Sequence, residues 1–437
     1  MPLVTLIYQA IRSNGRSADG NRYVYDDNII DRLCHYHTNM ILMMFTAMVV
    51  TKHYVGSPIQ CFCPAHFTST EVKYTNRVCW VSNTYYIPFS REIPSNYETR
   101  MSTEITYYQW VPVMLLLMAM FLKLPRLVWR LGVQMSGIGL KNSLKLTHLT
   151  QDLSPEDREK RLRSLSKYIG RWASSSASPY RSGICGSLWE RFGNYFFLGC
   201  GRHYGNYLVS LAIIIRLLYF INNVGLLFFL NEFLGNKFYL FGYEVIASVF
   251  KGEEWVMSPR FPLVTLCDLD LRQMTNVQRW TLQCVLPVNF YNERFFVFLW
   301  FWFTMLAVLS FINLISLLFA TVVPQNRESF IKKYLLLNSL DLWENKSAFP
   351  KLITKFVGGF LKPDGVYLLK LISSNSQSTG VSDIIKYLWE DFREQSTMTC
   401  NRRTDPNRKY GRFNGETVVP LVNGTSTMHH RNKEYFL

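Results

Sequence analysis

The sequence predicts an all-α polytopic membrane protein with four membrane-spanning helices. Its 437 residues carry a formal charge of +16, yet the mean hydropathy is +0.03, so very apolar stretches must alternate with strongly basic ones. Apolar runs of about 20 residues, long enough to cross a bilayer as a helix, occur four times. They cover residues 38–55, 107–129, 207–233 and 295–323. The first is the weakest, because it is short and ends at Lys52 and His53.

The second span opens on Tyr107, Tyr108, Gln109 and Trp110, with Pro112 close behind. Tyrosine and tryptophan rings are favoured at the water–lipid boundary, and glutamine adds hydrogen-bonding capacity at that depth. Proline costs least in the first turn of a helix, where its missing amide would have no partner. We therefore expect these five residues to mark one membrane boundary. The sequence leaves open whether they only anchor the helix or also brace the neighbouring loops.

Polar residues interrupt the third and fourth spans. Arg216 lies well inside the third, where a cation costs about 2.5–3.5 kcal/mol on insertion scales, so it must face protein or water or reach toward the headgroups. Asn222, Asn223, Ser310 and Asn313 can hydrogen-bond between helices. We expect these residues to serve helix packing rather than permeation.

The Lys and Arg counts of the connecting loops predict the orientation. Residues 130–206 hold 12 basic against 5 acidic residues, and residues 324–437 hold 17 against 11. Residues 56–106 hold 4 against 4, and residues 234–294 hold 6 against 6. Basic loops stay in the cytosol, so the first pair is expected inside with both termini, and the second pair outside. The missing signal-peptide pattern at the N-terminus agrees. The excess charge then needs no nucleic acid as a partner.

Five cysteines fall in the two expected outer loops: Cys61, Cys63, Cys79, Cys267 and Cys284. Disulfides persist in the oxidising exterior, so bonds within or between these loops are expected. Any four cysteines allow three pairings, and sequence spacing does not choose among them.

The expected cytosolic parts contain amphipathic helices. Ser154 and Pro155, followed by two acidic residues, are typical of a helix start. The apolar face of that helix is Leu162, Leu165, Ile169 and Trp172, and residues 381–392 form a second amphipathic segment. These helices are expected to pack into one inner domain, followed by a disordered tail from Ser396.

Several motifs together resemble the innexin family of invertebrate gap-junction proteins. The resemblance covers roughly residues 1–400. It is carried by Asp31-Arg32-Leu33 before the first span, "GSPIQC" at 56–61, "YYIPF" at 85–89, "YYQWV" at 107–111, "FPLVTLCDLDLR" at 261–272, "CVLPVNFYNERFFVFLWFW" at 284–302 and "IKKYL" at 331–335.

This resemblance implies a ring of subunits around one pore, with an octamer expected, that docks with a ring on the adjacent cell. It implies disulfide-tied extracellular loops with some β structure, a helical cytoplasmic domain, and pairing of Cys61 with Cys284 and of Cys79 with Cys267. Cys63 departs from the family pattern, as a free thiol or an alternative partner. In chain order, we expect an inner N-terminal segment (1–37), a first span (38–55), an outer loop (56–106), a second span (107–129) and an inner loop (130–206). These are followed by a third span (207–233), an outer loop (234–294), a fourth span (295–323), an inner helical region (324–395) and a disordered tail (396–437).

A conducting path needs polar groups facing inward through the apolar slab. An N-terminal helix over residues 2–12 could rest its apolar side on the first span and turn Thr5, Gln9 and Arg12 toward the pore. The alternative is a peripheral amphipathic anchor. Lys52 and His53 could form a ring of positive charge, and ordinary snorkelling of these side chains to the headgroups is the alternative.

Three functions remain to be weighed. The first is a gap-junction channel subunit in the plasma membrane that passes ions and small molecules between cells. The second is a hemichannel that does not dock, and the third is a four-span adhesion protein without a pore. The sequence shows no enzyme motif and implies no cofactor. His35 and His37 beside Cys34 are interpreted as an interfacial pair rather than a metal site.

Overall fold

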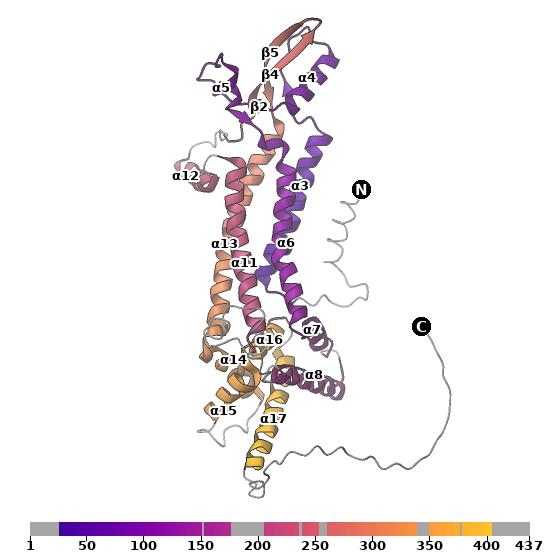
Figure 1. The fold of residues 1–437 in the computed structure, drawn as a ribbon, viewed down its shortest axis with the longest axis vertical. Coiled ribbons are helices and arrows are strands. Elements are labelled where there is room, and N and C mark those ends of the chain that lie inside the picture. The colour runs from indigo at the N-terminus through magenta and orange to yellow at the C-terminus, as the bar shows by residue number, and fades with distance from the viewer. Residues whose placement is uncertain are drawn as a thin grey trace, which may run out of the picture. The chain divides into compact units, whose positions relative to one another are not determined.

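The computed structural model describes residues 26–150, 153–175, 205–235, 238–252, 260–338, 349–375 and 378–403. The expected N-terminal helix over residues 2–12, with Thr5, Gln9 and Arg12, lies outside these ranges. The chain divides into two units, Met1–Glu390 and Asp391–Leu437. The architecture below is that of the first unit (Figure 1).

Four helices are long and apolar enough to cross a membrane: Ile29–Tyr54, Val111–Met135, Tyr207–Leu234 and Pro287–Val322. The first consists of α2 (Ile29–Arg32), a π-helical segment (Leu33–His37) and α3 (Thr38–Tyr54). The others are α6 (Val111–Met135), α11 (Tyr207–Leu234) and α13 (Pro287–Val322). These helices confirm the predicted all-α four-span class.

Two of the four helices begin earlier than the apolar runs that predicted them. The first starts at Ile29, where the Asn28 side chain caps its amide, and α13 starts at Pro287. Both early segments carry polar residues that lower the hydropathy, yet Asp31, Asn289 and Glu293 are buried. A hydropathy criterion therefore missed turns whose polar side chains are enclosed by the protein.

Hydrogen bonds between side chains and neighbouring helices join the four spans. Asn223 donates to Ser310 Oγ at 2.8 Å, and Asn222 donates to the Phe121 carbonyl at 2.9 Å. Trp302 Nε1 donates to Thr38 Oγ1 at 3.0 Å. The predicted packing role of the asparagines is confirmed.

A five-stranded antiparallel sheet lies at one end of the bundle, here called the sheet end (Figure 1). Its strands are β1 (Gln60–Cys61), β2 (Thr84–Tyr85), β3 (Glu104–Ile105), β4 (Val264–Gln273) and β5 (Asn276–Val285), in the order β1-β5-β4-β2-β3. Helices α4 (Ser69–Val81) and α5 (Tyr97–Met101) and the 3-10 turn Tyr107–Gln109 accompany it. The 3-10 turn Phe238–Leu240 and helix α12 (Phe241–Lys251) follow α11 and lie at the side of the bundle. The sheet thus combines strands from both segments expected to be outer loops.

The opposite end, here called the helical end, contains the segments expected to form the inner domain. They are α7 (Leu140–Leu149), α8 (Pro155–Ser175), α14 (Pro324–Asn338), α15 (Phe349–Lys355), a π-helical turn (Phe356–Leu361), α16 (Lys362–Asn375) and the part of α17 (Ser378–Arg403) that belongs to the first unit. The predicted start of α8 is confirmed, because the Asp157 amide donates to Ser154 Oγ at 3.4 Å. Helix α17 continues to Arg403 and so includes the first residues of the segment from Ser396 that is expected to be disordered. The rest of that segment lies outside the described ranges.

Candidate functional site

Two disulfides hold the sheet end together. They join Cys61 to Cys284 and Cys79 to Cys267, which are the pairs that the family resemblance implies. Cys61 lies opposite Cys284 in the register of β1 and β5. Each bond connects the segment between α3 and α6 to the segment between α11 and α13. The β4–β5 hairpin is thereby tied to α4 and β1.

The disulfide sulfurs also form a compact group, because the Sγ atoms of Cys61, Cys79 and Cys284 lie within 4.8 Å of one another. All three are consumed in disulfides, so they offer no thiolate for a metal ion. Cys63 is a free thiol that donates to the Cys61 carbonyl at 3.6 Å. Burial raises its pKa, which keeps the sulfur protonated and weakly nucleophilic at neutral pH.

The run before α6 braces the sheet end. Tyr107 and Tyr108 are buried, whereas Trp110 is 60% exposed, so two of the three rings point into the protein rather than outward. Gln109 Nε2 donates to the Trp80 carbonyl of α4 at 2.6 Å and to Asn83 at 3.1 Å. The glutamine therefore fixes the start of α6 to the end of α4.

The tyrosine hydroxyl and the proline complete this arrangement. Tyr107 donates its hydroxyl to the Arg260 carbonyl at 3.0 Å, just before β4. Pro112 lies in the first turn of α6, as predicted. The run therefore contacts both disulfide-tied segments. The sequence had left open whether these residues only anchor the helix or also brace the neighbouring loops.

Lys52 and His53 end α3 in different surroundings. The Lys52 side chain is exposed, with Nζ 5.0 Å from the ring centre of Tyr291 in α13. The His53 ring packs against Trp80 of α4, with centroids 5.1 Å apart. Lys52 therefore lies at the surface, while His53 turns toward the sheet end.

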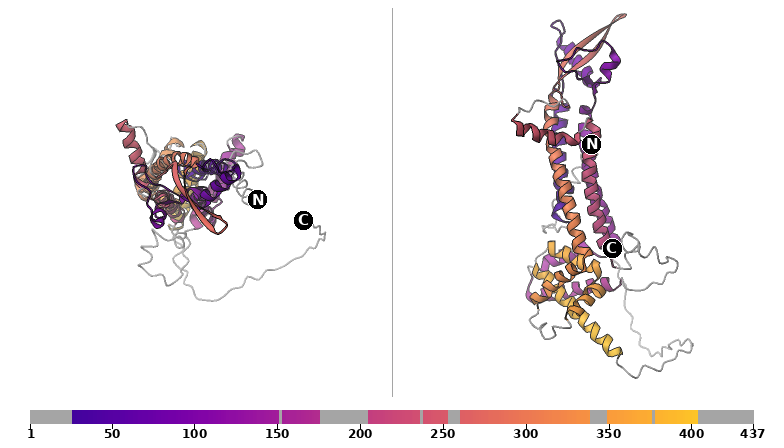
Figure 2. Two further views of the ribbon diagram at one scale, coloured as in Figure 1. Left: turned by 90° about the horizontal axis from the view of Figure 1, so that it is seen from above. Right: turned by 90° about the vertical axis from the view of Figure 1, so that its left-hand side faces the viewer.

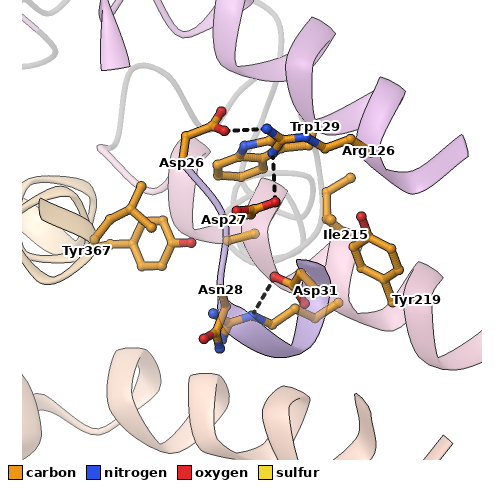
Figure 3. Close-up of a pocket in the computed structure, with 12 residues that line it drawn as sticks. Asp26, Asp27, Asn28, Asp31, Arg126, Trp129, Ile215, Tyr219 and Tyr367 are labelled. Atoms are coloured by element: carbon orange, nitrogen blue, oxygen red, sulfur yellow. Dashed lines mark hydrogen bonds and ion pairs between the residues drawn. The ribbon is translucent and has the colours of Figure 1, made fainter. Parts of the chain in front are cut away.

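A network of buried charges lies where the first helix begins (Figure 3). Arg126 of α6 pairs with Asp26 and lies 3.7 Å from Asp27. Asp27 also contacts His35 Nε2 at 2.6 Å and Arg32 at 3.2 Å. Burial by itself raises the pKa of Asp27, but the hydrogen bond from His35 and the charges of Arg126 and Arg32 outweigh it, so the pKa lies below its ordinary value.

The network continues across α11 and α13. Arg216 Nε lies 3.9 Å from Asp31 Oδ2, so the cation inside the third span faces protein, one of the three possibilities that the sequence allowed. Asn313 donates to Asp31 at 2.9 Å and accepts from Asn28 at 2.8 Å. Residues 26–31 are therefore held by side chains from three membrane-spanning helices.

A small cavity separates the two halves of this network. Its volume is about 20 Å³, and Asp27, Asp31, Arg126, Arg216 and Tyr219 are among its lining residues (Figure 3). That volume accommodates about one water molecule, and the lining supplies the polar partners that a buried water requires.

Comparison with known proteins decides the family. The Innexin family profile matches residues 27–392, which include both disulfides and most of the charge network. The chain belongs to the innexin family. It is 36% identical to Innexin unc-9 of Caenorhabditis elegans over 368 residues, covering 84% of this chain and 92% of that protein. It is 32% identical to Innexin-3 of the same organism over 368 residues, covering 84% of each.

Membership in the innexin family implies a gap-junction channel subunit that works in oligomeric membrane assemblies. It also places the chain among channel proteins rather than enzymes.

The partners that hold the start of the first helix could not be identified from the sequence. Asp26, Asp27 and Arg126 were not singled out, although an acidic pair before a helix start and an arginine near the end of an apolar run were visible. Only the fold brings them together, because Asp26 and Arg126 are 100 residues apart in sequence.

A second overlooked residue is Asp364 of α16, at the helical end. Its carboxylate accepts the Val209 amide at 3.0 Å in the first turn of α11, and its own amide donates to the Gly205 carbonyl at 3.0 Å. Burial raises its pKa to about 6, against the lowering effect of three backbone amides. Asp364 thus caps a membrane-spanning helix from a distant segment.

Proposed function

We propose that this innexin is a subunit of an octameric ring that docks with a ring on the adjacent cell and passes ions and small molecules between the two cytosols. The observation that carries the proposal is the disulfide-tied sheet end on a four-span bundle. Docking needs a surface that keeps its shape when no partner is present, and two disulfides between separate loops provide it.

The proposed docking element is the β4–β5 hairpin. Its strands pair from Val264 with Val285 to Gln273 with Asn276, and two disulfides tie both strands to α4 and β1. Met274 at the turn is 98% exposed. For the hairpin to dock, the sheet end must lie outside the cell and both termini in the cytosol. The Lys and Arg counts of the loops support this orientation.

We further propose that Thr5, Gln9 and Arg12 line the cytoplasmic mouth of the pore. Asp26 and Asp27 follow this segment in the chain, and their ion pairs with Arg126 support the proposal because they fix the start of the described chain against α6. Substituting each of the three polar residues by alanine tests the assignment, and unchanged single-channel currents in all three variants would remove it.

Lys52 is proposed to place positive charge at the other mouth of the pore. Its exposed ammonium would disfavour cations there, whereas His53 beside it packs on Trp80 and contributes less. Reversal potentials of Lys52→Glu test this proposal, and an unchanged ion preference would leave Lys52 as an ordinary surface lysine.

Paired-cell recording tests the main proposal. Two cells expressing the full chain are expected to show junctional current and dye transfer, and Cys79→Ser is expected to abolish both. Cys63→Ser is the matched control, because Cys63 takes part in neither disulfide, and it is expected to conduct normally.

The alternatives predict other outcomes. Current in single cells without junctional current would favour the undocked hemichannel. Cell adhesion without any current, also when the chain is co-expressed with a second innexin, would favour the non-conducting four-span protein.

A further inference from the structure

The helix α12 leaves the four-helix bundle sideways. Its residues Phe241–Lys251 follow the short 3-10 turn Phe238–Leu240 just after the end of α11. In Figure 1 and in both views of Figure 2 it projects away from the long helices instead of continuing along them. A helix in that position exposes most of its length to whatever surrounds the bundle.

The first turn of α12 is fixed firmly to α13. Phe238 and Phe241 are fully buried, with the Phe238 ring 6.3 Å from Phe296. Gly242 packs on the Trp300 indole so closely that an added Cβ would clash with the ring. Trp300 Nε1 also donates to the Tyr239 carbonyl at 3.2 Å. The helix is therefore held at the level of Phe296–Trp300, where the long apolar run of α13 begins.

The exposed side of α12 and of the turn before it is a row of apolar side chains. Tyr239, Tyr243, Ile246 and Phe250 recur at helical spacing and are 52%, 67%, 38% and 86% exposed. This set is called the apolar stripe below.

The other side of α12 is polar. Glu244 pairs with Arg260 at 3.1 Å, and Ser248 donates to the Glu244 carbonyl at 3.0 Å. Lys251 extends the polar side in the last turn of the helix. The helix thus has one face suited to water and one suited to an apolar medium.

We propose that α12 lies in the interface of the membrane leaflet on the sheet-end side and inserts its apolar stripe at the boundary of headgroups and acyl chains. An interfacial helix needs one apolar face with aromatic residues and an opposite polar face, held parallel to the membrane. The apolar stripe, the polar side and the fixed level on α13 meet these requirements. The partner is a lipid surface.

A neighbouring copy of the chain fits this face less well. A standard protein interface buries about 800 Å² on each partner, and a single row of four side chains falls well short of that area. Tyrosine at two of the four positions also suits the interface, because each ring is apolar while its hydroxyl reaches water. The proposal does not depend on conduction or docking, so it can fail while the proposed function holds.

Photo-cross-linking in intact membranes tests the proposal. The full chain carries p-benzoylphenylalanine at position 243 or 250 in place of the native aromatic residue, and position 248 on the polar side is the matched control. After irradiation, the peptide covering α12 is analysed by mass spectrometry for phospholipid adducts, and the whole protein by gel for cross-linked subunits. Lipid adducts at 243 and 250 are expected to exceed those at 248 several-fold.

Two results would overturn the proposal. Cross-linked subunits at 243 and 250 without lipid adducts would assign the apolar stripe to a neighbouring copy. Equal adduct yields at 243, 248 and 250 would show that the stripe is not inserted. Both exposed positions tolerate a bulky ring, since neither Tyr243 nor Phe250 is buried, and delivery to the cell surface verifies folding.

Discussion

The sheet end and the start of the first helix are both held by residues far apart in sequence, but by different chemistry. At the sheet end, two disulfides join residues 223 and 188 positions apart. At the start of the first helix, Asp26, Asp27 and Arg126 are joined by buried ion pairs. One region is tied covalently, and the other depends on charges kept away from water.

Because of this difference, the two regions tolerate different changes in pH, salt and sequence. A disulfide persists over a wide range of pH and salt in an oxidising compartment. A buried charge network is stable only while every charge keeps its partner, because an unpaired buried ion is costly. The covalent end therefore keeps its shape over a wide range of conditions, whereas the ionic end depends on each charge keeping its partner.

The largest effect is expected from Arg126→Gln. Arg126 is the shared partner of two buried carboxylates, and removing one member of a buried pair costs about 3–5 kcal/mol. The matched control is Arg279→Gln, because Arg279 pairs with Asp270 at 2.7 Å while both side chains are about half exposed. Exposed pairs contribute about 0–1 kcal/mol. Thermal unfolding of the purified proteins gives both values, and equal losses would contradict the division between buried and exposed pairs.

The next effect is expected from Cys79→Ser. Loss of a native disulfide typically costs about 2–5 kcal/mol, mainly because it frees the unfolded chain. The helices already hold the two loops near each other, so we expect a value toward the lower end. The measurement is again thermal unfolding, together with the yield at the cell surface. Cys63→Ser should change the unfolding temperature little, and a loss as large as that of Cys79→Ser would mean that the free thiol shares the structural role.

A pH-dependent effect is expected from Asp364, whose pKa in the folded protein is about 6. An unfolded aspartate releases its proton at about pH 4. The folded state therefore binds the proton more tightly, and the stability present at low pH is lost as the pH rises from about 4 to 6. Asp364→Asn keeps an oxygen that can accept the Val209 amide but cannot ionise, so its stability should not fall over this range.

Comparing the unfolding temperatures of wild type and Asp364→Asn between about pH 4 and 7 checks this expectation. Asp383→Asn at the same end is the control, because Asp383 is a third exposed and pairs with Arg158 at 2.8 Å. If wild type gained stability relative to Asp364→Asn as the pH rises through this range, the pKa of Asp364 would not be raised in the folded protein.

Much of the fold could be predicted from the sequence, because each membrane-spanning helix is a continuous local run of apolar residues. A run of apolar residues is enough to predict a membrane helix, and α11, which covers Tyr207–Leu234, agrees closely with the predicted 207–233. The disulfide pairs could be anticipated from the family motifs around Cys61, Cys79, Cys267 and Cys284, although spacing alone left three choices.

The charge network could not be predicted in the same way, since it depends on which helix faces meet. Arg126 looked like a basic residue near the end of a span, and only the packing of α6 beside the first helix gives it two carboxylates. The run before α6 shows a related limit. Tyrosines near a membrane boundary suggest contact with lipid, yet Tyr107 and Tyr108 are buried because the sheet end covers them.

The smallest effect is expected at the tip of the β4–β5 hairpin. Met274 has φ +55°, a left-handed conformation that costs a side-chain-bearing residue roughly 1–2 kcal/mol and glycine almost nothing. Met274→Gly should therefore stabilise the sheet end slightly, by at most about 1 kcal/mol, since glycine also loses more entropy on folding. Hydrogen exchange of the β4 and β5 amides is sensitive enough to measure this. If the variant also loses junctional current while exchange slows, Met274 acts through its side chain at the docking surface, because the hairpin itself would then be intact.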